Sequence, residues 1–187
     1  YKERIVGQLD LDFLHDGIPR KKLNADVAKV QTQPLTKAET NDTYTDTLLK
    51  LLAHPNIRSR ENVIRVYDHE IKGATAVKPL VGVANHGPSD ASVLVPNTNS
   101  TRGVALSNGI CPQYGERDPY AMTFAAVDEA VRNAVAVGAD PDRIAILDNF
   151  CWGNPTLPDR LGSLLETSRS CHDAALLYET PFVSGKD

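Results

Sequence analysis

Two long helical patterns separated by a short apolar run constrain the fold of this chain more than any other feature. The first follows Asp118, whose side chain suits a helix N-cap, and it has Pro119 at its first helical position. Apolar residues then recur at helical spacing until Gly138, a residue that readily adopts the left-handed conformation that ends helices. The second pattern runs from about Pro158 to Tyr178. The sequence therefore predicts two long helices in this half of the chain.

Each helical pattern is followed by a run that predicts a β-strand. Arg143–Leu147 is almost continuously apolar, as buried strands are, and it ends at Asp148. Pro181–Val183 is a second such run, and shorter runs rich in Val and Leu lie between residues 76 and 107. Because strands alternate with long helices, we expect a layered α/β domain in which helices cover a mixed sheet.

The composition bounds the class of protein. With 187 residues, 41% of them hydrophobic, the chain can build one well-cored domain with an appendage. The net charge of -4 offers no basic field to a phosphate backbone, and no apolar run approaches the roughly 18 residues of a membrane span. We therefore expect neither nucleic acid nor membrane as a partner. No secretory signal opens the chain, which favours a cytoplasmic location.

The three cysteines predict no structural role for sulfur. Their number is odd and no Cys-x-x-Cys spacing is present, so neither a disulfide framework nor a structural zinc site is indicated. A zinc ion held by Cys151, Cys171 and His172 is disfavoured because no pair of them has the customary ligand spacing.

The texture of the sequence changes near residue 40. Residues 20–40 carry charge, Gln and Thr with little apolar periodicity, and we interpret them as a linker. From Asn41 a helical pattern begins, which Asp42 or Thr43 can cap and Pro55 stops. The chain begins without Met and ends on a glycine-containing turn directly after an apolar run, so we expect a piece of a longer protein.

Polar residues stand where both of the C-terminal predicted strands end. Asp148 and Asn149 open a loop that contains Trp152, and Gly185 and Lys186 follow the last strand. In sheets with helical crossovers, ligands bind at strand ends of this kind. Backbone N–H groups around Gly185 and the ammonium of Lys186 could contact phosphate oxygens. The alternative is that Asp148 and Asn149 only cap the loop while Trp152 fills the core.

Two further groups of carboxylates are candidate ligands. Asp128 and Glu129 are adjacent on the polar side of the first long helix, where they could help to hold a Mg²⁺ ion that bridges phosphates. The alternative for Asp128 is an exposed ion pair with Arg132, four residues on. Asp90 ends the turn Gly87–Asp90, and it is either a turn residue or a nucleotide or metal ligand.

Several segments in one order carry a resemblance to a known family. They are Tyr67–Glu70, Val77–Gly82, Gly87–Ala91, Ala105–Gly109, Asp118–Tyr120, Ala126–Asn133, Leu147–Pro155 and Thr180–Asp187. Their order and spacing resemble the second ATP-binding-type domain of the phosphoribosylformylglycinamidine synthase family, in the aminoimidazole ribonucleotide synthetase superfamily. Upstream, Phe13–Arg20 is similar to the tail of the preceding domain. The resemblance implies a division into residues 1–40, tail and linker, and residues 41–187, the second ATP-binding-type domain, truncated at its C-terminal end.

The resemblance implies an activity for the whole enzyme. Members of this family convert formylglycinamide ribonucleotide to formylglycinamidine ribonucleotide in de novo purine biosynthesis. ATP activates the amide oxygen as an iminophosphate, and ammonia that a glutaminase domain or subunit releases from glutamine displaces the phosphate. Two ATP-binding-type domains pair through their sheets into a central barrel. The other domain supplies the catalytic His and most metal ligands, so we expect no catalytic residue here and no activity from the isolated fragment.

The resemblance also implies site residues. The nucleotide contacts fall on Asp148 and Gly185, so ATP or ADP with Mg²⁺ is the expected ligand. Many relatives have Asn as a magnesium ligand where this chain has Lys186. A cation there would repel Mg²⁺ but could neutralise phosphate directly, which predicts an auxiliary or structural nucleotide site.

Two rival interpretations remain beside the nucleotide site. One is a purely structural pairing domain that binds no ligand. The other, a kinase-like member of the superfamily, is disfavoured by the segments Tyr67–Glu70 and Asp148–Pro155, which match the synthase family better. The isolated domain would expose the sheet face that its partner domain buries, so we expect it to form a homodimer.

Overall fold

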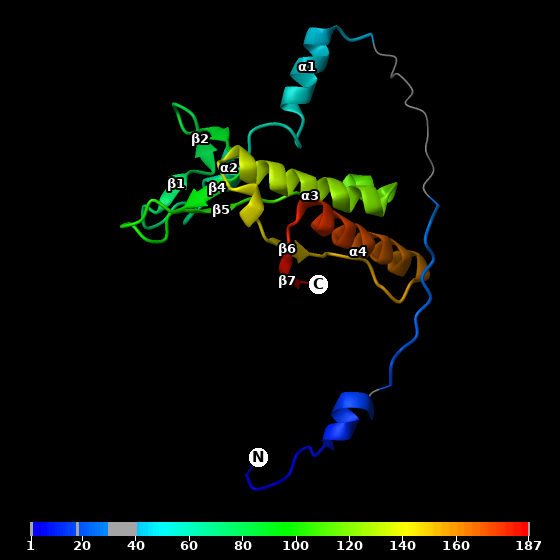
Figure 1. Cartoon of the computed structure of the whole chain (residues 1–187). Helices are drawn as coiled ribbons and strands as arrows, with labels where there is room; N and C mark the ends of the chain where they lie inside the picture. The colour runs from blue at the N-terminus through cyan, green and yellow to red at the C-terminus, as the bar shows by residue number, and fades with distance from the viewer. Residues whose placement is uncertain (1, 18, 30–40, 187) are drawn as a thin grey trace.

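The computed structural model of the chain describes residues 2–17, 19–29 and 41–186 (Figure 1). The predicted linker therefore lies partly outside the described residues, and Asp187 lies outside them altogether. In chain order the elements are η1 Phe13–Gly17, α1 Tyr44–Ala53, α2 Glu61–Ile64, β1 Thr75–Val77, β2 Leu80–Val81, β3 Gly87–Pro88, β4 Ser92–Leu94, β5 Val104–Leu106, η2 Pro112–Glu116, α3 Pro119–Ala136, η3 Pro141–Arg143, β6 Ile146–Asn149, α4 Pro158–Tyr178 and β7 Phe182–Lys186.

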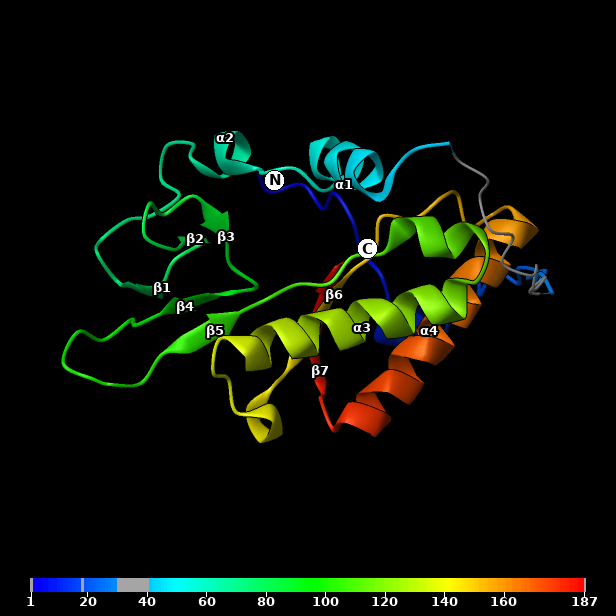
Figure 2. The same ribbon diagram turned by 90° about the horizontal axis from the view of Figure 1, so that it is seen from above.

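The α/β class is confirmed, with the strands divided among separate sheets. Within the described part of the chain, β1, β4 and β5 form an antiparallel sheet in the order β1-β4-β5, β2 and β3 form an antiparallel pair, and β6 and β7 form a parallel pair. The strands β1 to β5 gather at one end of the molecule, beside the C-terminal end of α3 (Figures 1 and 2). In the parallel pair, β6 follows α3 and β7 follows α4 in the sequence.

Helices α3 and α4 lie side by side and form the best-buried part of the molecule (Figure 2). The hydroxyl of Ser170 on α4 donates a hydrogen bond of 2.7 Å to the Tyr120 carbonyl oxygen on α3. Small side chains allow the two helices to approach this closely. Those that are buried are Thr123, Val127 and Ala134 on α3 and Gly162, Thr167, Ser170 and Ala174 on α4.

Two tyrosines, one on each helix, donate hydrogen bonds to carboxylates on the other helix. Tyr120 on α3 donates its hydroxyl hydrogen to Asp173 Oδ2 on α4, at 2.8 Å. Tyr178 on α4 donates in turn to Asp128 Oδ1 on α3. Because the residue numbers of the partners rise together, the two helices run in the same general direction. This is the arrangement expected of helices that each precede a strand of a parallel pair.

The predicted helix ends are confirmed. Asp118 caps α3 by accepting a hydrogen bond of 2.9 Å from the Ala121 N–H, and Pro119 is the first helical residue. Gly138 follows the helix with φ +96°, the left-handed conformation that glycine adopts without strain. At α1 the capping residue is Thr43, which forms a capping box with Asp46.

The strand boundaries differ from those predicted. The strand predicted over Arg143–Leu147 begins only at Ile146, because Asp140 caps a short 3-10 turn over Pro141–Arg143. The last strand continues past Val183 to Lys186. Apolar content identified both strands, but the turn and the pairing partner set their limits.

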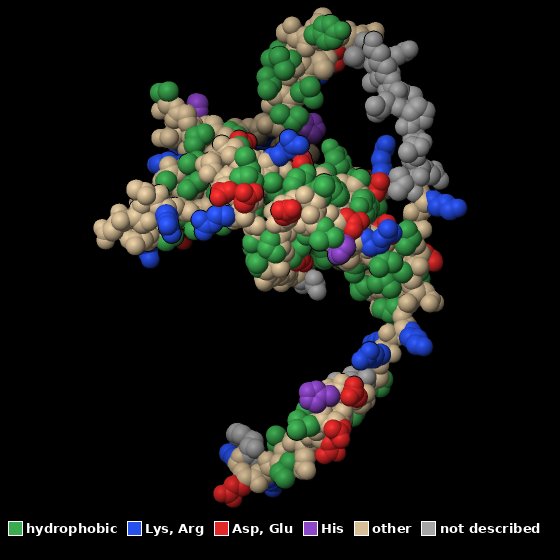
Figure 3. All heavy atoms as spheres, viewed as in Figure 1, with side chains coloured by type: hydrophobic (Ala, Val, Ile, Leu, Met, Phe, Trp, Pro, Cys, Tyr) green, Lys and Arg blue, Asp and Glu red, His purple; other side chains and the backbone are tan. Residues whose placement is uncertain are grey.

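Helix α1 exposes its apolar side chains. About half or more of each leucine side chain is exposed at Leu48, Leu49, Leu51 and Leu52. Figure 3 shows hydrophobic side chains over this helix at the top of the molecule. No helix among the described residues combines the length and the apolar character needed to cross a bilayer.

Strands β5 and β6 also carry exposed apolar side chains. Ser107 donates a hydrogen bond of 2.7 Å to the Ala130 carbonyl oxygen on α3, so alternate residues of β5 face away from that helix. Along β6, Leu147 is exposed while its neighbours Ile146 and Asp148 are half-buried, so Leu147 points away from them. The exposed apolar side chains of these two strands, which we call the open strand face, are Val104 at 52%, Leu106 at 56% and Leu147 at 68%.

Candidate functional site

The two strand ends singled out in the sequence lie side by side. In the parallel β6–β7 pair, Asp148 is opposite Gly185 and Asn149 is opposite Lys186. A hydrogen bond of 2.8 Å from the Phe150 N–H to the Lys186 carbonyl oxygen extends the pairing beyond these rungs. Four of the predicted site residues are therefore brought together on two adjacent rungs of one ladder.

Gly185 makes room for the Asp148 carboxylate. A Cβ atom at position 185 would lie 2.6 Å from Cγ of Asp148 and closer still to Oδ1. Carbon atoms in proteins do not approach one another so closely, so a side chain at this position would displace the carboxylate. The absence of a side chain on β7 thus sets the position of an acidic group on β6.

Cys171 on α4 is a neighbour of this carboxylate that sequence reasoning missed. Burial, and then the negative charge of Asp148, raise the pKa of the Cys171 thiol to about 11. No spacing rule links a residue in the middle of a helix to the end of the preceding strand. Only the tertiary structure brings Cys171 close enough to Asp148 for the carboxylate charge to raise the pKa of the thiol.

Residues Ser184–Lys186 form an extended strand and not the turn that was predicted. Gly185 and Lys186 continue β7 and pair with β6, and Gly185 has no left-handed φ. A phosphate group would therefore meet an extended strand edge and the Lys186 side chain, which is exposed, as is that of Asn149. Their contact with a nucleotide stays a prediction.

The loop after β6 is held against α4 by Trp152. Its Nε1–H lies 3.1 Å from the Arg160 carbonyl oxygen and 3.2 Å from Ser163 Oγ, both in the first turns of the helix. The indole also packs edge-on against Phe150, with ring centroids 6.0 Å apart. Trp152 is half-buried and fastens the loop to α4, whereas the structural alternative for this loop had Trp152 fill the core.

The two carboxylates predicted to hold magnesium already have partners. Asp128 pairs with Arg132 at 2.6 Å and accepts from Tyr178, and these two hydrogen bonds, Arg132 first, hold its pKa below the ordinary value of 3.8. Glu129 Oε2 accepts from the Ile110 N–H at 2.9 Å. Magnesium would have to compete with these donors, and its binding by Asp128 and Glu129 stays a prediction.

Asp90 is not brought to the β6–β7 pair. It is exposed and precedes β4, which belongs to the antiparallel sheet β1-β4-β5. Among the residues that the structure describes, no group of three or more His, Cys, Asp and Glu side chains gathers as a metal centre. Any role of Asp90 as a ligand stays a prediction.

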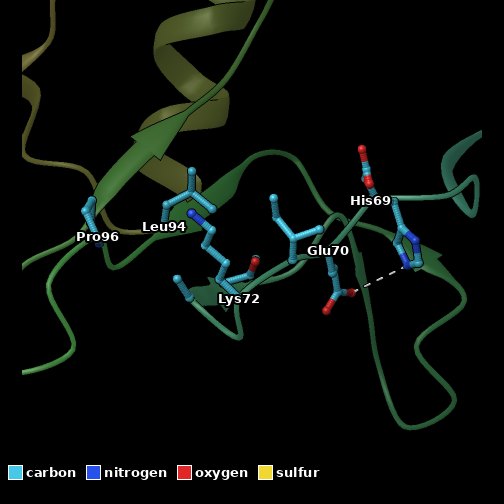
Figure 4. Close-up of a pocket in the computed structure, with 9 residues that line it drawn as sticks. His69, Glu70, Lys72, Leu94 and Pro96 are labelled. Atoms are coloured by element: carbon cyan, nitrogen blue, oxygen red, sulfur yellow. Dashed lines mark ion pairs between the residues drawn. The ribbon is translucent and has the colours of Figure 1, made fainter.

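A recess lies near the segment Tyr67–Glu70. Figure 4 shows His69 and Glu70 on one side of it and Leu94 and Pro96 on the other. Glu70 lies 2.9 Å from Lys78 Nζ and 3.9 Å from His69 Nε2. The recess holds about 260 Å³, below the roughly 300–1,000 Å³ typical of organic ligand sites, so it does not suit a nucleotide.

Comparison with known proteins gives a family match over the second half of the chain. The family described as AIR synthase related protein, N-terminal domain, matches residues 88–186. The match covers β6, α4 and β7, and therefore both strand ends of the candidate site.

Relatives align with nearly the whole chain. It is 37% identical over 185 residues to phosphoribosylformylglycinamidine synthase subunit PurL of Methanocaldococcus jannaschii, and 32% identical over 187 residues to the subunit of the same name from Picrophilus torridus. Each alignment covers 99% of this chain and 24% of the relative, so the chain spans about a quarter of their length.

A solved structure shares the fold. The structure of PurLQS from Thermotoga maritima matches 100% of this chain and 27% of its own chain, with a TM-score of 0.66 and 20% sequence identity. At this identity the likeness supports the arrangement of helices and strands.

Proposed function

We propose that this chain, which belongs to the AIR synthase related proteins through their N-terminal domain, is a domain of a phosphoribosylformylglycinamidine synthase. Relatives that align with 99% of the chain carry that name. The proposal includes the ATP- and glutamine-dependent conversion of formylglycinamide ribonucleotide to the amidine in cytoplasmic purine biosynthesis. It also includes a glutaminase domain or subunit as the source of ammonia.

Within that enzyme, we assign this domain an auxiliary site for a nucleotide phosphate. The observation that carries this assignment is the rung that pairs Asp148 with Gly185. Asp148 offers oxygen atoms of the kind that Mg²⁺ takes, and Lys186 offers an ammonium to phosphate. Because adjacent rungs point to opposite faces, Asp148 lies on one face and Asn149 and Lys186 lie on the other, so a phosphate would have to sit at the end of the two strands to meet both. Bound magnesium would neutralise phosphate charge, while the residues of this chain would position the phosphates.

Calorimetric titration with ATP and ADP, each with and without Mg²⁺, tests the site. We expect binding by the wild type, and a loss of affinity of about tenfold or more for Asp148→Asn and Lys186→Ala, since each removes a charge-assisted contact. Asp142→Asn, an exposed carboxylate on η3, serves as the control. If the wild type binds neither nucleotide under any condition, the domain is a structural pairing unit without a ligand.

The domain is also proposed to pair through its open strand face. Val104, Leu106 and Leu147 leave apolar area exposed. Exposed apolar patches of this kind commonly mark interfaces. In the full enzyme the partner would be the other ATP-binding-type domain, giving the central barrel, and in isolation it would be a second copy.

Light scattering over a concentration series tests the pairing. We expect a dimer for the wild type and a monomer for Leu147→Lys, because an ammonium on the paired face would be buried without a partner. Leu176→Lys is a matched control, since Leu176 lies on α4 and is 67% exposed against 68% for Leu147. A wild type that stays monomeric at high concentration, or a monomer caused equally by both variants, contradicts pairing through this face.

A further inference from the structure

The chain that precedes residue 30 makes a main-chain contact with the start of α4. The Asp26 N–H donates a hydrogen bond of 2.9 Å to the Pro158 carbonyl oxygen, in the first turn of the helix. Figure 1 shows this segment, in blue, running past the N-terminal end of α4, in orange. Residues separated by more than half of the sequence are thus joined through their backbones.

Gly162 is the residue of α4 that admits this contact. It is buried, and a Cβ atom there would lie 2.9 Å from the Val27 nitrogen and closer still to the Asp26 carbonyl group. These are backbone atoms, which cannot swing aside as the end of a flexible side chain can. Glycine is the poorest helix former after proline, so its place inside α4 needs a reason such as this close approach.

The contact depends on the backbone and not on side chains. Leu23 and Val27 remain 50% and 47% exposed, so the segment contributes little buried apolar surface of its own. The Asp26 N–H and the missing side chain at Gly162 account for the fit. The space left by the missing side chain at Gly162, which we call the Gly162 notch, accepts an extended chain and has no room for a side chain at position 162.

The same two turns of α4 also hold the loop that follows Asp148. Trp152 reaches Arg160 and Ser163, while Asp26 reaches Pro158 and Gly162. The first turns of α4 therefore lie between two segments of the chain that are remote from each other in sequence.

We propose that residues 24–28 form a strap that seats in the Gly162 notch and braces the start of α4, and with it the Trp152 loop. The strap thereby links whatever part of a longer chain precedes residue 24 to the loop beyond Asp148. The proposal holds whether or not the domain binds a nucleotide, because it rests on contacts within the chain.

The matched pair Gly162→Ala and Gly7→Ala tests the strap. A Cβ atom at Gly7 meets nothing within 4 Å. Two readouts are available: hydrogen exchange of the Asp26 amide, and acrylamide quenching of Trp152, which is the single tryptophan of the chain. We expect Gly162→Ala to speed the exchange roughly tenfold or more and to increase quenching, while Gly7→Ala leaves both unchanged.

A double-mutant cycle with Asp26→Pro separates the strap from a general loss of stability. Proline removes the N–H donor and so releases the strap without changing α4. In the wild-type background Gly162→Ala should lower the melting temperature by displacing the strap. In the Asp26→Pro background it should raise it, because alanine then only improves the helix. A rise of equal size in both backgrounds, with unchanged exchange at Asp26, overturns the proposal.

Discussion

The carboxylate of Asp148 occupies the space that a side chain at position 185 would need. The two residues form one rung of the parallel β6–β7 pair, and a Cβ on Gly185 would lie 2.6 Å from Asp148 Cγ. Asp148 can leave this position by rotating about its own side-chain bonds. A substitution at Gly185 is therefore expected to move an acidic group more than to break the ladder.

Replacing Gly185 with alanine tests this relationship. We expect the unfolding free energy to stay within about 1 kcal/mol of the wild type, because the displaced atoms belong to a side chain that can rotate. Nucleotide affinity, measured by calorimetry, should fall about tenfold as the carboxylate leaves its position. Unchanged affinity in a well-folded Gly185→Ala variant of a binding-competent protein would show that the Asp148 position is irrelevant to the ligand.

The reactivity of Cys171 reports on the Asp148 carboxylate. Burial raises the pKa of the Cys171 thiol to about 11, with a further contribution from the Asp148 charge, so little reactive thiolate is present near pH 8. Alkylation by iodoacetamide, followed by mass spectrometry, should modify the exposed Cys151 first. Asp148→Asn should speed modification of Cys171, since removal of the negative charge favours the thiolate, and should leave the rate at Cys151 unchanged. Equal Cys171 rates in both proteins would place the carboxylate away from the thiol.

Acid should weaken the contact between α3 and α4. Hydrogen bonds from Arg132 and then Tyr178 hold the pKa of Asp128 in the folded state below its ordinary value. The Asp128 carboxylate therefore stabilises the folded state fully at pH values above its pKa in the unfolded chain, which is about 3.9. This contribution is lost as the pH falls through the lowered folded pKa. Urea unfolding should therefore show Asp128→Asn less stable than the wild type by a constant amount between about pH 5 and 7, with the gap closing below about pH 4. A gap that persists undiminished at the lowest pH would assign the loss to packing and not to charge.

Thr180 offers a stabilising substitution. Its side chain is 1% exposed, and Oγ1 has no hydrogen-bond partner among the described residues. Thr180→Val keeps the shape and removes an unpaired buried hydroxyl, so we expect the unfolding free energy to rise by about 1 kcal/mol. Ser170→Ala is the opposite case, because it removes the bonded hydroxyl between the helices and should lower stability by about 1 kcal/mol. A loss of stability in Thr180→Val would indicate an ordered water molecule that satisfies Oγ1.

The helix ends could be predicted from the sequence because their causes are local. Asp118, Pro119 and Gly138 act on backbone groups within a few residues of themselves, and the structure has them in the predicted roles. The limits of the strands could not be predicted as well. The end of β7 at Lys186 depends on pairing with β6, which lies far away in the sequence.

The candidate site was predictable in part for the same reason. Parallel strands joined through a helix bring their carboxyl ends to one edge, so the approach of the two strand ends follows from the order of elements, whereas the register that pairs Asp148 with Gly185 does not. The engagement of Asp128 by Tyr178, and of Glu129 by the Ile110 N–H, could not be read from spacing. Both partners come from other elements, and their approach depends on how α3 packs.

The sequence by itself determined the succession of helices and strands, the helix caps and the family to which the chain belongs, since these depend on short-range chemistry and on residue order. Only the tertiary structure decided that a carboxylate lies over Gly185, that its charge acts on the Cys171 thiol, and that Gly162 receives the Asp26 backbone. The physical reason is steric. The sequence shows where a glycine lies but not which atoms occupy the space that a side chain would need, because tertiary packing determines those atoms.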